Sequence, residues 1–329
     1  MEDSRPEVLV LNPPSVMKYY HSHLSQRFHL LKPYESLPPT LHFLATHGSS
    51  VKAMLCSGES QVTAEVIRSL PALKLVLTTS AGVNHIDLRE CQRRGIAVAN
   101  AGEIFSADCA DLAVGLLIDV LRRITAGDRF VRAGAWPKPA HTQGGAPPLG
   151  SKVRGKRLGI IGLGSIGRLV AKRTEALGFI VSYNSRRAKP SVPYPYHSDV
   201  RELAANSDVL IICCALTAQT RHMVNREVLL ALGKAGVVVN VARGAVIDEK
   251  ELVKCLVEGE IHGAGLDVYE NEPDVPKELL SLNNVVLSSH RAVFTPESYA
   301  DLYELIVRNL DAFFSNRPLV TPVLPVDEE

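Results

Sequence analysis

The stretch "RLGIIGLGSIGRLVAKR", from Arg157 to Arg173, decides the fold. A short apolar run leads into three glycines with the spacing G-x-G-x-x-G, and a helical pattern follows them at once. This motif is weak evidence alone, but between a strand and a helix it is typical of a dinucleotide-binding βαβ unit. The glycines let the backbone turn tightly and approach a pyrophosphate at the positive end of the helix. The alternative is a tight turn without a ligand. We predict that the pyrophosphate is bound by Gly162, Leu163, Gly164, Ser165 and Ile166.

A second informative stretch, "IVSYNSRRAK", runs from Ile180 to Lys189. Folds that use NAD place an Asp or Glu about twenty residues after the glycines, where it bonds the ribose 2′-hydroxyl. No acid stands there in this chain. A hydroxyl and two guanidinium groups stand there instead, and they suit a 2′-phosphate through charge-assisted hydrogen bonds. We therefore predict NADP(H) as the cofactor, with a solvated basic loop as the alternative. The residues expected to bind the 2′-phosphate are Ser185, Arg186 and Arg187.

Apolar runs that resemble buried strands alternate with helical patterns along most of the chain, which indicates parallel sheets with helices on their faces. Before the glycine loop we expect strands at residues 8–12, 53–57 and 73–80, with a helix at 63–70. After it, strands are expected in "FIVSYN", "SDVLIICC", "AGVVVNVA", "GAGLDVY" and "VVLSSH". One long helix is expected at 106–134, and an amphipathic helix at 297–318.

The length of 329 residues suggests about two domains. We predict an α/β protein with two doubly wound parallel sheets. A Rossmann-type cofactor domain, residues 105–293, is inserted in a flavodoxin-like substrate-binding domain, residues 1–104 and 294–329. The second domain is discontinuous because the simplest course for the tail helix is back onto the N-terminal part.

Composition excludes several classes of function. A formal net charge of +1 gives no reason to expect nucleic acid or a membrane surface as a partner. No apolar stretch reaches the ~18 residues that cross a bilayer. The six cysteines are scattered without metal-binding spacing, so we expect reduced thiols and no metal. The ends carry no signal, transit or peroxisomal pattern, so we expect a cytoplasmic protein.

Three charged residues follow the ends of successive predicted strands: Arg243, Glu272 and His290. Strand ends of an open α/β sheet form its ligand crevice, so these side chains are expected to converge beside the cofactor. A histidine suits proton donation to a carbonyl oxygen, and a carboxylate would orient and stabilise its imidazolium. An arginine can bind a carboxylate and polarise a carbonyl. Together they fit the reduction of a 2-oxo acid, although each alone could be a structural or surface residue.

Five motifs in this order resemble the D-isomer-specific 2-hydroxyacid dehydrogenases: "SAGVNHID", "GLGSIGRLVAKR", "NVARGAVIDEKEL", "GAGLDVYENEP" and "SSHRAVFTPES". The resemblance covers residues from about 51 to 317. It is greatest to the plant-type glyoxylate/hydroxypyruvate and hydroxyphenylpyruvate reductases that prefer NADPH. It implies a reductase that turns small 2-oxo acids into D-2-hydroxy acids, with the three charged residues above as the catalytic set.

The resemblance implies further site residues. A loop would bind the substrate carboxylate through backbone N–H groups, next to Arg243 and His290; it comprises Ser80, Ala81, Gly82 and Val83. Asp267 would meet the nicotinamide carboxamide. The cofactor would also be lined by Cys214, Ala215, Leu216, Val241, Ala242, Arg243, His290 and Ala292. The family pattern after the histidine resembles P-H-x-G-S. The different residues here, Arg291 and Val293, would alter the rim of the pocket.

The only tryptophan, Trp136, follows the long predicted helix. That helix is too apolar for one domain to cover, which favours a homodimer with twofold symmetry. The resemblance implies that a tryptophan at this place reaches the partner's active site and limits the space for the substrate side chain. The alternative is a residue of local packing.

Two other functions are alternatives to a reductase. A nucleotide-sensing, corepressor-like interaction protein on the same fold would be expected to carry long extensions, and almost none lie beyond the predicted core. An NAD-linked dehydrogenase of a phosphorylated hydroxy acid would be expected to carry an acid near Asn184 and a regulatory C-terminal domain. Neither is present.

Overall fold

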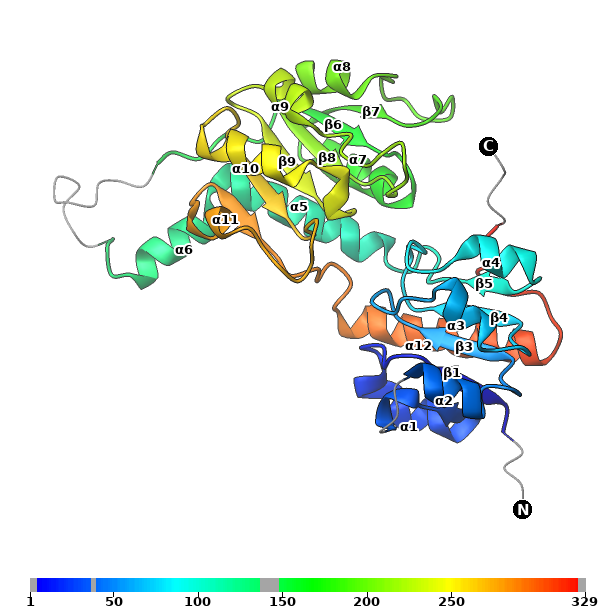
Figure 1. The fold of residues 1–329 in the computed structure, drawn as a ribbon. Helices are drawn as coiled ribbons and strands as arrows, with labels where there is room; N and C mark the ends of the chain where they lie inside the picture. The colour runs from blue at the N-terminus through cyan, green and yellow to red at the C-terminus, as the bar shows by residue number, and fades with distance from the viewer. Residues whose placement is uncertain (1–4, 37–39, 137–147, 325–329) are drawn as a thin grey trace. The chain divides into compact units, whose positions relative to one another are not determined.

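The computed structural model describes residues 5–36, 40–136 and 148–324. Its contacts divide the chain into two compact units (Figure 1). Unit 1 comprises Met1–Phe105 and Phe294–Glu329, and unit 2 comprises Ser106–Val293. Most of the Gly/Pro-rich stretch after Trp136 falls at 137–147, outside the described residues.

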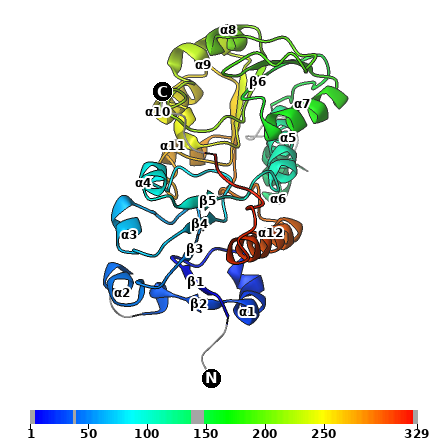
Figure 2. The same ribbon diagram turned by 90° about the vertical axis from the view of Figure 1, so that its right-hand side faces the viewer.

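Unit 1 is built on a parallel sheet with the strand order β2-β1-β3-β4-β5, which is the flavodoxin-like order. The strands are strongly apolar because helices cover both faces. Figure 2 shows α1 and α12 on one face and α2, α3 and α4 on the other. The strands are β1 (Glu7–Val10), β2 (His29–Leu31), β3 (Ala53–Cys56), β4 (Leu75–Thr78) and β5 (Ala97–Ala99). The helices are α1 (Met17–Arg27), η1 (Pro33–Glu35), α2 (Thr40–His47), α3 (Ala64–Arg68), α4 (Leu88–Arg93) and α12 (Pro296–Phe314).

The tail helix α12 is part of unit 1 although it comes from the other end of the chain. Thr295 caps it by accepting the N–H of Ser298, and Pro296 occupies its first turn. An ion pair of 2.7 Å between Arg27 and Asp311 joins it to the end of α1. The core of unit 1 therefore combines residues that are far apart in sequence.

Unit 2 is built on a parallel sheet with the strand order β11-β10-β9-β8-β6-β7. One core lies between this sheet and α5 with α7, and a second lies on the other face under α8, α9 and α10. The strands are β6 (Arg157–Ile161), β7 (Ile180–Asn184), β8 (Val209–Ile212), β9 (Val237–Asn240), β10 (Gly263–Leu266) and β11 (Val285–Leu287). The helices are α5 (Ser106–Arg122), α6 (Ile124–Arg132), α7 (Ser165–Ala176), α8 (Val200–Ala205), α9 (Arg226–Leu232), η2 (Gly244–Val246), α10 (Glu249–Val257) and α11 (Lys277–Ser281).

The prediction of one unbroken helix over 106–134 was wrong. Arg123 adopts the left-handed conformation, with φ of +59°, and this ends α5 and starts α6 in a new direction. Asp119 stabilises the break, because its carboxylate accepts both the backbone N–H and the hydroxyl of Thr125. The apolar periodicity continues through the break, so the pattern alone could not reveal it.

The predicted fold class is confirmed, because both sheets are parallel and doubly wound. The expected strands and the tail helix are present with slightly shorter bounds, and the short strands β2 and β5 are additions. All six cysteines are free. None of the described helices combines the length and apolarity that crossing a bilayer would require.

Candidate active site

The glycine loop lies where the strand order of unit 2 reverses. β6 pairs with β7 on one side and with β8 on the other. Such a switch point opens the crevice in which α/β sheets bind ligands. Residues 162–166 follow β6 and residues 214–216 follow β8, so two of the predicted cofactor segments meet there. The third, at 241–243, follows the neighbouring strand β9 at the same edge.

Gly162 shows why this loop requires glycine. Its φ is +95°, and a Cβ added to it would lie 2.6 Å from the backbone nitrogen of Cys214. Helix α7 begins at Ser165, and its N-cap, Gly164, has no side chain to accept the N–H groups of the first turn. A close backbone approach and an uncapped positive helix end fit a pyrophosphate, so a dinucleotide fits this cradle.

Arg186 and Arg187 are exposed just beyond β7, and neither guanidinium bonds to another described residue. The strand ends without a carboxylate, since Asn184 is buried and donates its amide to two backbone oxygens at 2.9 and 3.1 Å. Ser185 donates its hydroxyl to the carbonyl oxygen of Arg187 at 2.7 Å. Ser185 therefore organises this loop, and the two arginines present their charges to solvent.

His290 and Glu272 meet beyond the ends of β11 and β10. Nδ1 of His290 lies 2.8 Å from Oε2 of Glu272, and Oε1 of Glu272 accepts the N–H of Tyr269 at 3.0 Å. Burial opposes ionisation of Glu272, but these two bonds and the charges of His290 and Arg243 outweigh it and lower the pKa of the carboxyl. The ionised carboxylate takes the hydrogen of Nδ1, so Nε2 is the nitrogen that can exchange a proton.

Asp267, at the end of β10, holds the loop of His290. Its backbone oxygen accepts the N–H of His290 at 2.8 Å, and its carboxylate accepts those of Arg291 and Ala292 at 2.8 and 3.2 Å. These bonds keep His290 at a φ of +52°, which residues other than glycine rarely adopt. Asp267 is only 1 % exposed. It thus positions the histidine, a role that the sequence did not suggest.

Arg243 follows β9, and its guanidinium interacts with the charge of Glu272. Burial lowers the pKa of Arg243 and the charge of Glu272 opposes that shift. The guanidinium stays charged because an arginine side chain keeps its proton even when its pKa is lowered from the ordinary value. The next residue, Gly244, touches the backbone of Tyr269, because a Cβ added to it would lie 1.9 Å from the carbonyl carbon of Tyr269. This contact joins the turn of Arg243 to the loop of Glu272.

In unit 1, the predicted carboxylate loop of residues 80–83 follows β4, and all four of its carbonyl oxygens accept hydrogen bonds. Each oxygen accepts a bond from a donor of unit 1: Ser80 from the N–H of Ala101 at 3.0 Å, Ala81 from the Asn100 amide at 2.7 Å, Gly82 from the Ser80 hydroxyl at 2.7 Å, and Val83 from the N–H of Ile86 at 3.0 Å. Among the described residues, none accepts a bond from the N–H groups of Ala81, Gly82 or Val83. A row of such N–H groups fits an anion.

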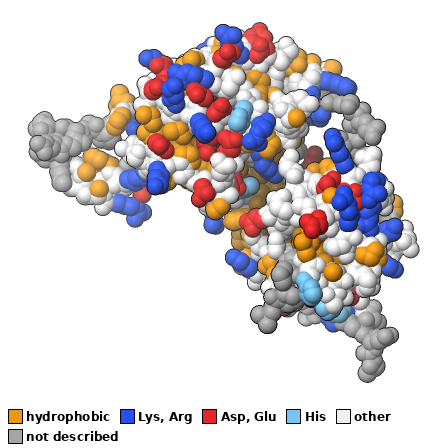
Figure 3. Space-filling model, in the orientation of Figure 1, with side chains coloured by type: hydrophobic (Ala, Val, Ile, Leu, Met, Phe, Trp, Pro, Cys, Tyr) orange, Lys and Arg blue, Asp and Glu red, His pale blue; other side chains and the backbone are white. Residues whose placement is uncertain are grey.

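Trp136 is 73 % exposed and follows α6, a helix without a buried residue. Figure 3 shows hydrophobic side chains on the surface of this part of unit 2. Within the described part of the chain, no bond or ring contact links Trp136 to the catalytic candidates. The structure therefore does not bring it into their group.

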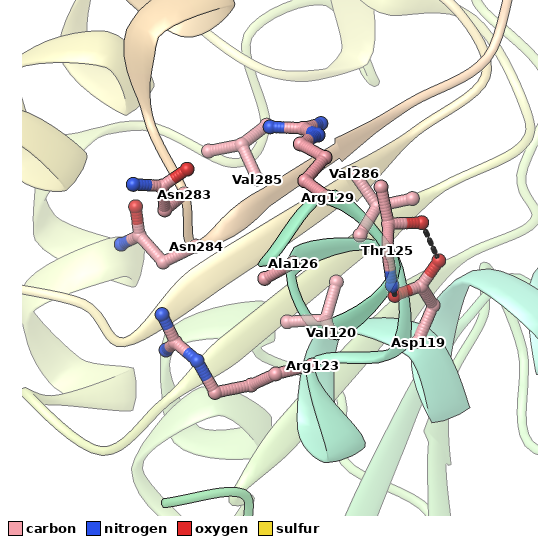
Figure 4. A pocket seen from close by; sticks show the side chains of 10 residues that line it. All are labelled: Asp119, Val120, Arg123, Thr125, Ala126, Arg129, Asn283, Asn284, Val285 and Val286. Atoms are coloured by element: carbon pink, nitrogen blue, oxygen red, sulfur yellow. Dashed lines mark hydrogen bonds between the residues drawn. The ribbon is translucent and has the colours of Figure 1, made fainter. Parts of the chain in front are cut away.

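A small pocket lies near the amino end of β11, at the other end of the unit 2 strands from His290 (Figure 4). Side chains from α5, α6 and the amino end of β11 line it, and Thr125 bonds to Asp119 there. Ligands of α/β sheets bind at the carboxyl ends of the strands, where His290 stands. The pocket is therefore separate from the candidate site. The residues that the structure describes hold no group of His, Cys, Asp and Glu suited to a metal ion.

Two supporting residues were not predicted from the sequence. The hydroxyl of Tyr269 donates to the backbone oxygen of Ser288 at 2.8 Å and so links the loops after β10 and β11. Thr78 is 1 % exposed and contacts Ser80 and His85. Thr78 is the polar last residue of an apolar strand, and Tyr269 lies in the loop after one; these positions are the only signal that could have identified them.

Comparisons with known proteins identify the family of the chain. Residues 114–292 match the family model described as D-isomer specific 2-hydroxyacid dehydrogenase, NAD binding domain. A glyoxylate/hydroxypyruvate reductase of Arabidopsis thaliana is 54 % identical over 98 % of each chain. A hydroxyphenylpyruvate reductase of Plectranthus scutellarioides is 45 % identical over 96 % of this chain and 98 % of its own. The solved NADPH-dependent glyoxylate/hydroxypyruvate reductase of Sinorhizobium meliloti, in complex with NADP and malonate, superposes with a TM-score of 0.87 at 33 % identity, over 99 % of each chain.

Proposed function

Because the chain belongs to the D-isomer-specific 2-hydroxyacid dehydrogenases, we propose that it is an NADPH-dependent reductase that forms D-2-hydroxy acids from small 2-oxo acids. The observation that carries this proposal is the pair of His290 and Glu272, 2.8 Å apart and electrostatically coupled to Arg243. A proton donor, its anionic partner and a cation are the groups that this reduction requires.

The roles follow from the chemistry of the side chains. When bound, NADPH supplies the hydride. His290 would give the proton of Nε2 to the carbonyl oxygen, and Glu272 would stabilise the imidazolium before that transfer. Arg243 would bind the oxygens of the 2-oxo acid and draw charge toward the carbonyl oxygen. The N–H groups of residues 81–83 would bind the carboxylate.

The preference for NADPH rests on the end of β7. The guanidinium groups of Arg186 and Arg187 are exposed there and bond to no other described residue, and no carboxylate stands beside them to repel a phosphate. The name of the Sinorhizobium meliloti structure describes an NADPH-dependent enzyme in complex with NADP, which supports the same choice. The substrates that we propose are hydroxypyruvate and glyoxylate, with 4-hydroxyphenylpyruvate as a bulkier candidate, because relatives are named for these acids. A corepressor-like role is not proposed, since no observation favours it.

The test compares NADPH with NADH as the cofactor and replaces both arginines with alanine. Wild-type protein should oxidise NADPH with hydroxypyruvate or glyoxylate and use NADH less well. Arg186→Ala combined with Arg187→Ala removes charge-assisted contacts of ~1.5–3 kcal/mol each. The Michaelis constant for NADPH should therefore rise roughly ten- to a hundredfold or more, with little change for NADH. Equal changes for both cofactors would refute the role of the arginines.

We further propose that the protein acts as a homodimer in the cytoplasm. Helix α6 buries none of its residues, and its apolar side chains Ile124 and Val131 are 55 % and 52 % exposed. A second copy of the chain is the occupant that we propose for this surface, with Trp136 directed toward the partner's substrate. The cytoplasmic location stays a prediction from the sequence.

A further inference from the structure

A chain of hydrogen bonds that includes Thr78, the last residue of β4, stabilises the loop of residues 80–83. Oγ1 of Thr78 lies 3.0 Å from the hydroxyl of Ser80 and 3.0 Å from Nε2 of His85. The hydroxyl of Ser80 in turn lies 2.7 Å from the carbonyl oxygen of Gly82. Thr78 is 1 % exposed, so the middle of this chain is shielded from water.

The direction of each hydrogen in the chain can be worked out. The oxygen of Gly82 can only accept, so the hydroxyl of Ser80 donates its single hydrogen there. The hydrogen between Thr78 and Ser80 must then come from Thr78. The remaining hydrogen, between His85 and Thr78, comes from Nε2 of His85. The chain therefore runs one way, from His85 through Thr78 and Ser80 to the oxygen of Gly82.

A second anchor holds the other side of the loop. The amide of Asn100 donates to the oxygen of Ala81 at 2.7 Å, and its carbonyl oxygen accepts the N–H of Gly102 at 2.9 Å. The backbone oxygen of Asn100 accepts the hydroxyl of Thr321 at 2.6 Å. Both anchors bind carbonyl oxygens of the loop, while the N–H groups of residues 81–83 bond to no described residue.

We propose that Thr78 and Ser80 are positioning residues for the carboxylate of the substrate. They act through the peptide bond between Gly82 and Val83. The hydrogen bond to the oxygen of Gly82 fixes the orientation of this peptide plane, and therefore also the direction of the N–H group of Val83. The proposal rests on the proposed function, in which this loop binds a 2-oxo acid. It adds Thr78, and it assigns the hydroxyl of Ser80, a residue of the loop itself, to the orientation of the Gly82 peptide.

The expected effect is on substrate affinity more than on turnover. The carboxylate is bound in the ground state and in the transition state alike. Weaker binding of the carboxylate therefore raises KM and leaves kcat nearly unchanged. Loss of one hydroxyl that orients the loop should raise KM for hydroxypyruvate roughly three- to tenfold. The dissociation constant for NADPH should not change, because the glycine loop belongs to unit 2.

The experiment uses four variants of the full-length chain. Ser80→Ala and Thr78→Val remove the hydroxyl groups with little change in volume, and Thr78→Ser restores one. Ser69→Ala is the matched control, since that hydroxyl donates to the carbonyl oxygen of Val66 at 2.7 Å in another part of unit 1. The measurements are KM and kcat for hydroxypyruvate, NADPH binding by fluorescence, and the thermal unfolding midpoint.

The outcomes separate this proposal from the proposed function. A raised KM in Ser80→Ala and Thr78→Val, with Thr78→Ser and Ser69→Ala near wild type, would support positioning. An unchanged KM in Ser80→Ala, in a wild type that reduces hydroxypyruvate, would overturn the positioning role alone. A wild type that reduces no 2-oxo acid would overturn the proposed function first. If Thr78→Val does not fold, Ser80→Ala decides, because its hydroxyl contacts the loop directly.

Discussion

The pairing of His290 with Glu272 determines which protonation states the candidate site favours. The pKa of Glu272 is lowered because the bonds from His290 and Tyr269 and the charges of His290 and Arg243 outweigh the effect of burial. Glu272 is therefore ionised at neutral pH, and its negative charge faces Nδ1 of His290. In the direction of reduction the histidine must carry the proton before the reaction.

The substitution Glu272→Gln should move the reduction profile to lower pH. The neutral amide keeps a hydrogen-bond acceptor near Nδ1 but removes the negative charge, so the imidazolium loses stabilisation and the rate falls at a lower pH than in wild type. The measurement is kcat/KM for hydroxypyruvate from pH 5 to 9. His290→Gln is the comparison, and it should lose about 10²–10⁴ in kcat at every pH while NADPH still binds. An unchanged profile in Glu272→Gln would refute the pairing.

Close contact between two backbone turns holds the catalytic candidates together. η2 begins at Gly244, directly after Arg243, and the loop of residues 269–272 passes against it. The N–H of Glu270 also donates to the carboxylate of Glu249, at the start of α10, at 3.1 Å. The positions of Arg243 and Glu272 are therefore set by the same packing.

Gly244→Ala should damage catalysis more than folding of the rest of unit 2. A Cβ at 1.9 Å from the carbonyl carbon of Tyr269 must push the two turns apart, which displaces Arg243 relative to Glu272. A shift of about 1 Å in a catalytic group can cost about a hundredfold in rate, so kcat/KM should fall by about that factor. Gly115→Ala is the control, since a Cβ at that position in α5 meets no atom within 4 Å and alanine favours a helix. Equal activity of the two variants would contradict this account.

Among the helices that the structure describes in unit 2, α6 is one without a buried residue. It begins at the left-handed Arg123, runs without a buried residue, and leads to Trp136, which is 73 % exposed. Exposed apolar side chains in one segment are typical of a protein–protein contact. A twofold dimer would cover the same segment on both copies.

Val131→Glu should weaken the dimer that we propose. A charge on the exposed apolar side of α6 cannot be buried without a partner, so sedimentation velocity should show more monomer at assay concentration. Val257→Glu is the control, because this valine is similarly exposed, at 59 %, but lies on α10.

Trp136→Ala should leave the dimer intact and raise kcat/KM for 4-hydroxyphenylpyruvate relative to that for hydroxypyruvate. A wild-type monomer, or an unaltered substrate ranking in Trp136→Ala, would refute the role of Trp136 in the partner's site and favour the alternative of local packing.

Much of the candidate site could be predicted because it depends on local order. The glycine loop, the missing acid after β7 and the charged residues after three strands all follow from short segments and from the rule that parallel strands end at one edge. What could not be predicted depends on partners far away in sequence. Thr78 is one such case, because its role becomes visible only once His85 and the loop fold back onto β4. The break at Arg123 is another, since apolar periodicity records a buried face and not the direction of the axis.

The amino-acid sequence by itself determined the two doubly wound sheets, the dinucleotide loop, the family and the identity of the three catalytic candidates. These follow from alternating apolar patterns and from motifs in which neighbouring residues act together. Only the tertiary structure decided that Asp267 holds the histidine loop, that Ser185 bonds within its own loop, and that Gly244 joins the turn of Arg243 to the loop of Glu272. The physical reason is that hydrogen bonds and van der Waals contacts act over a few ångströms in space, and which groups come that close is settled only when separate strands lie side by side.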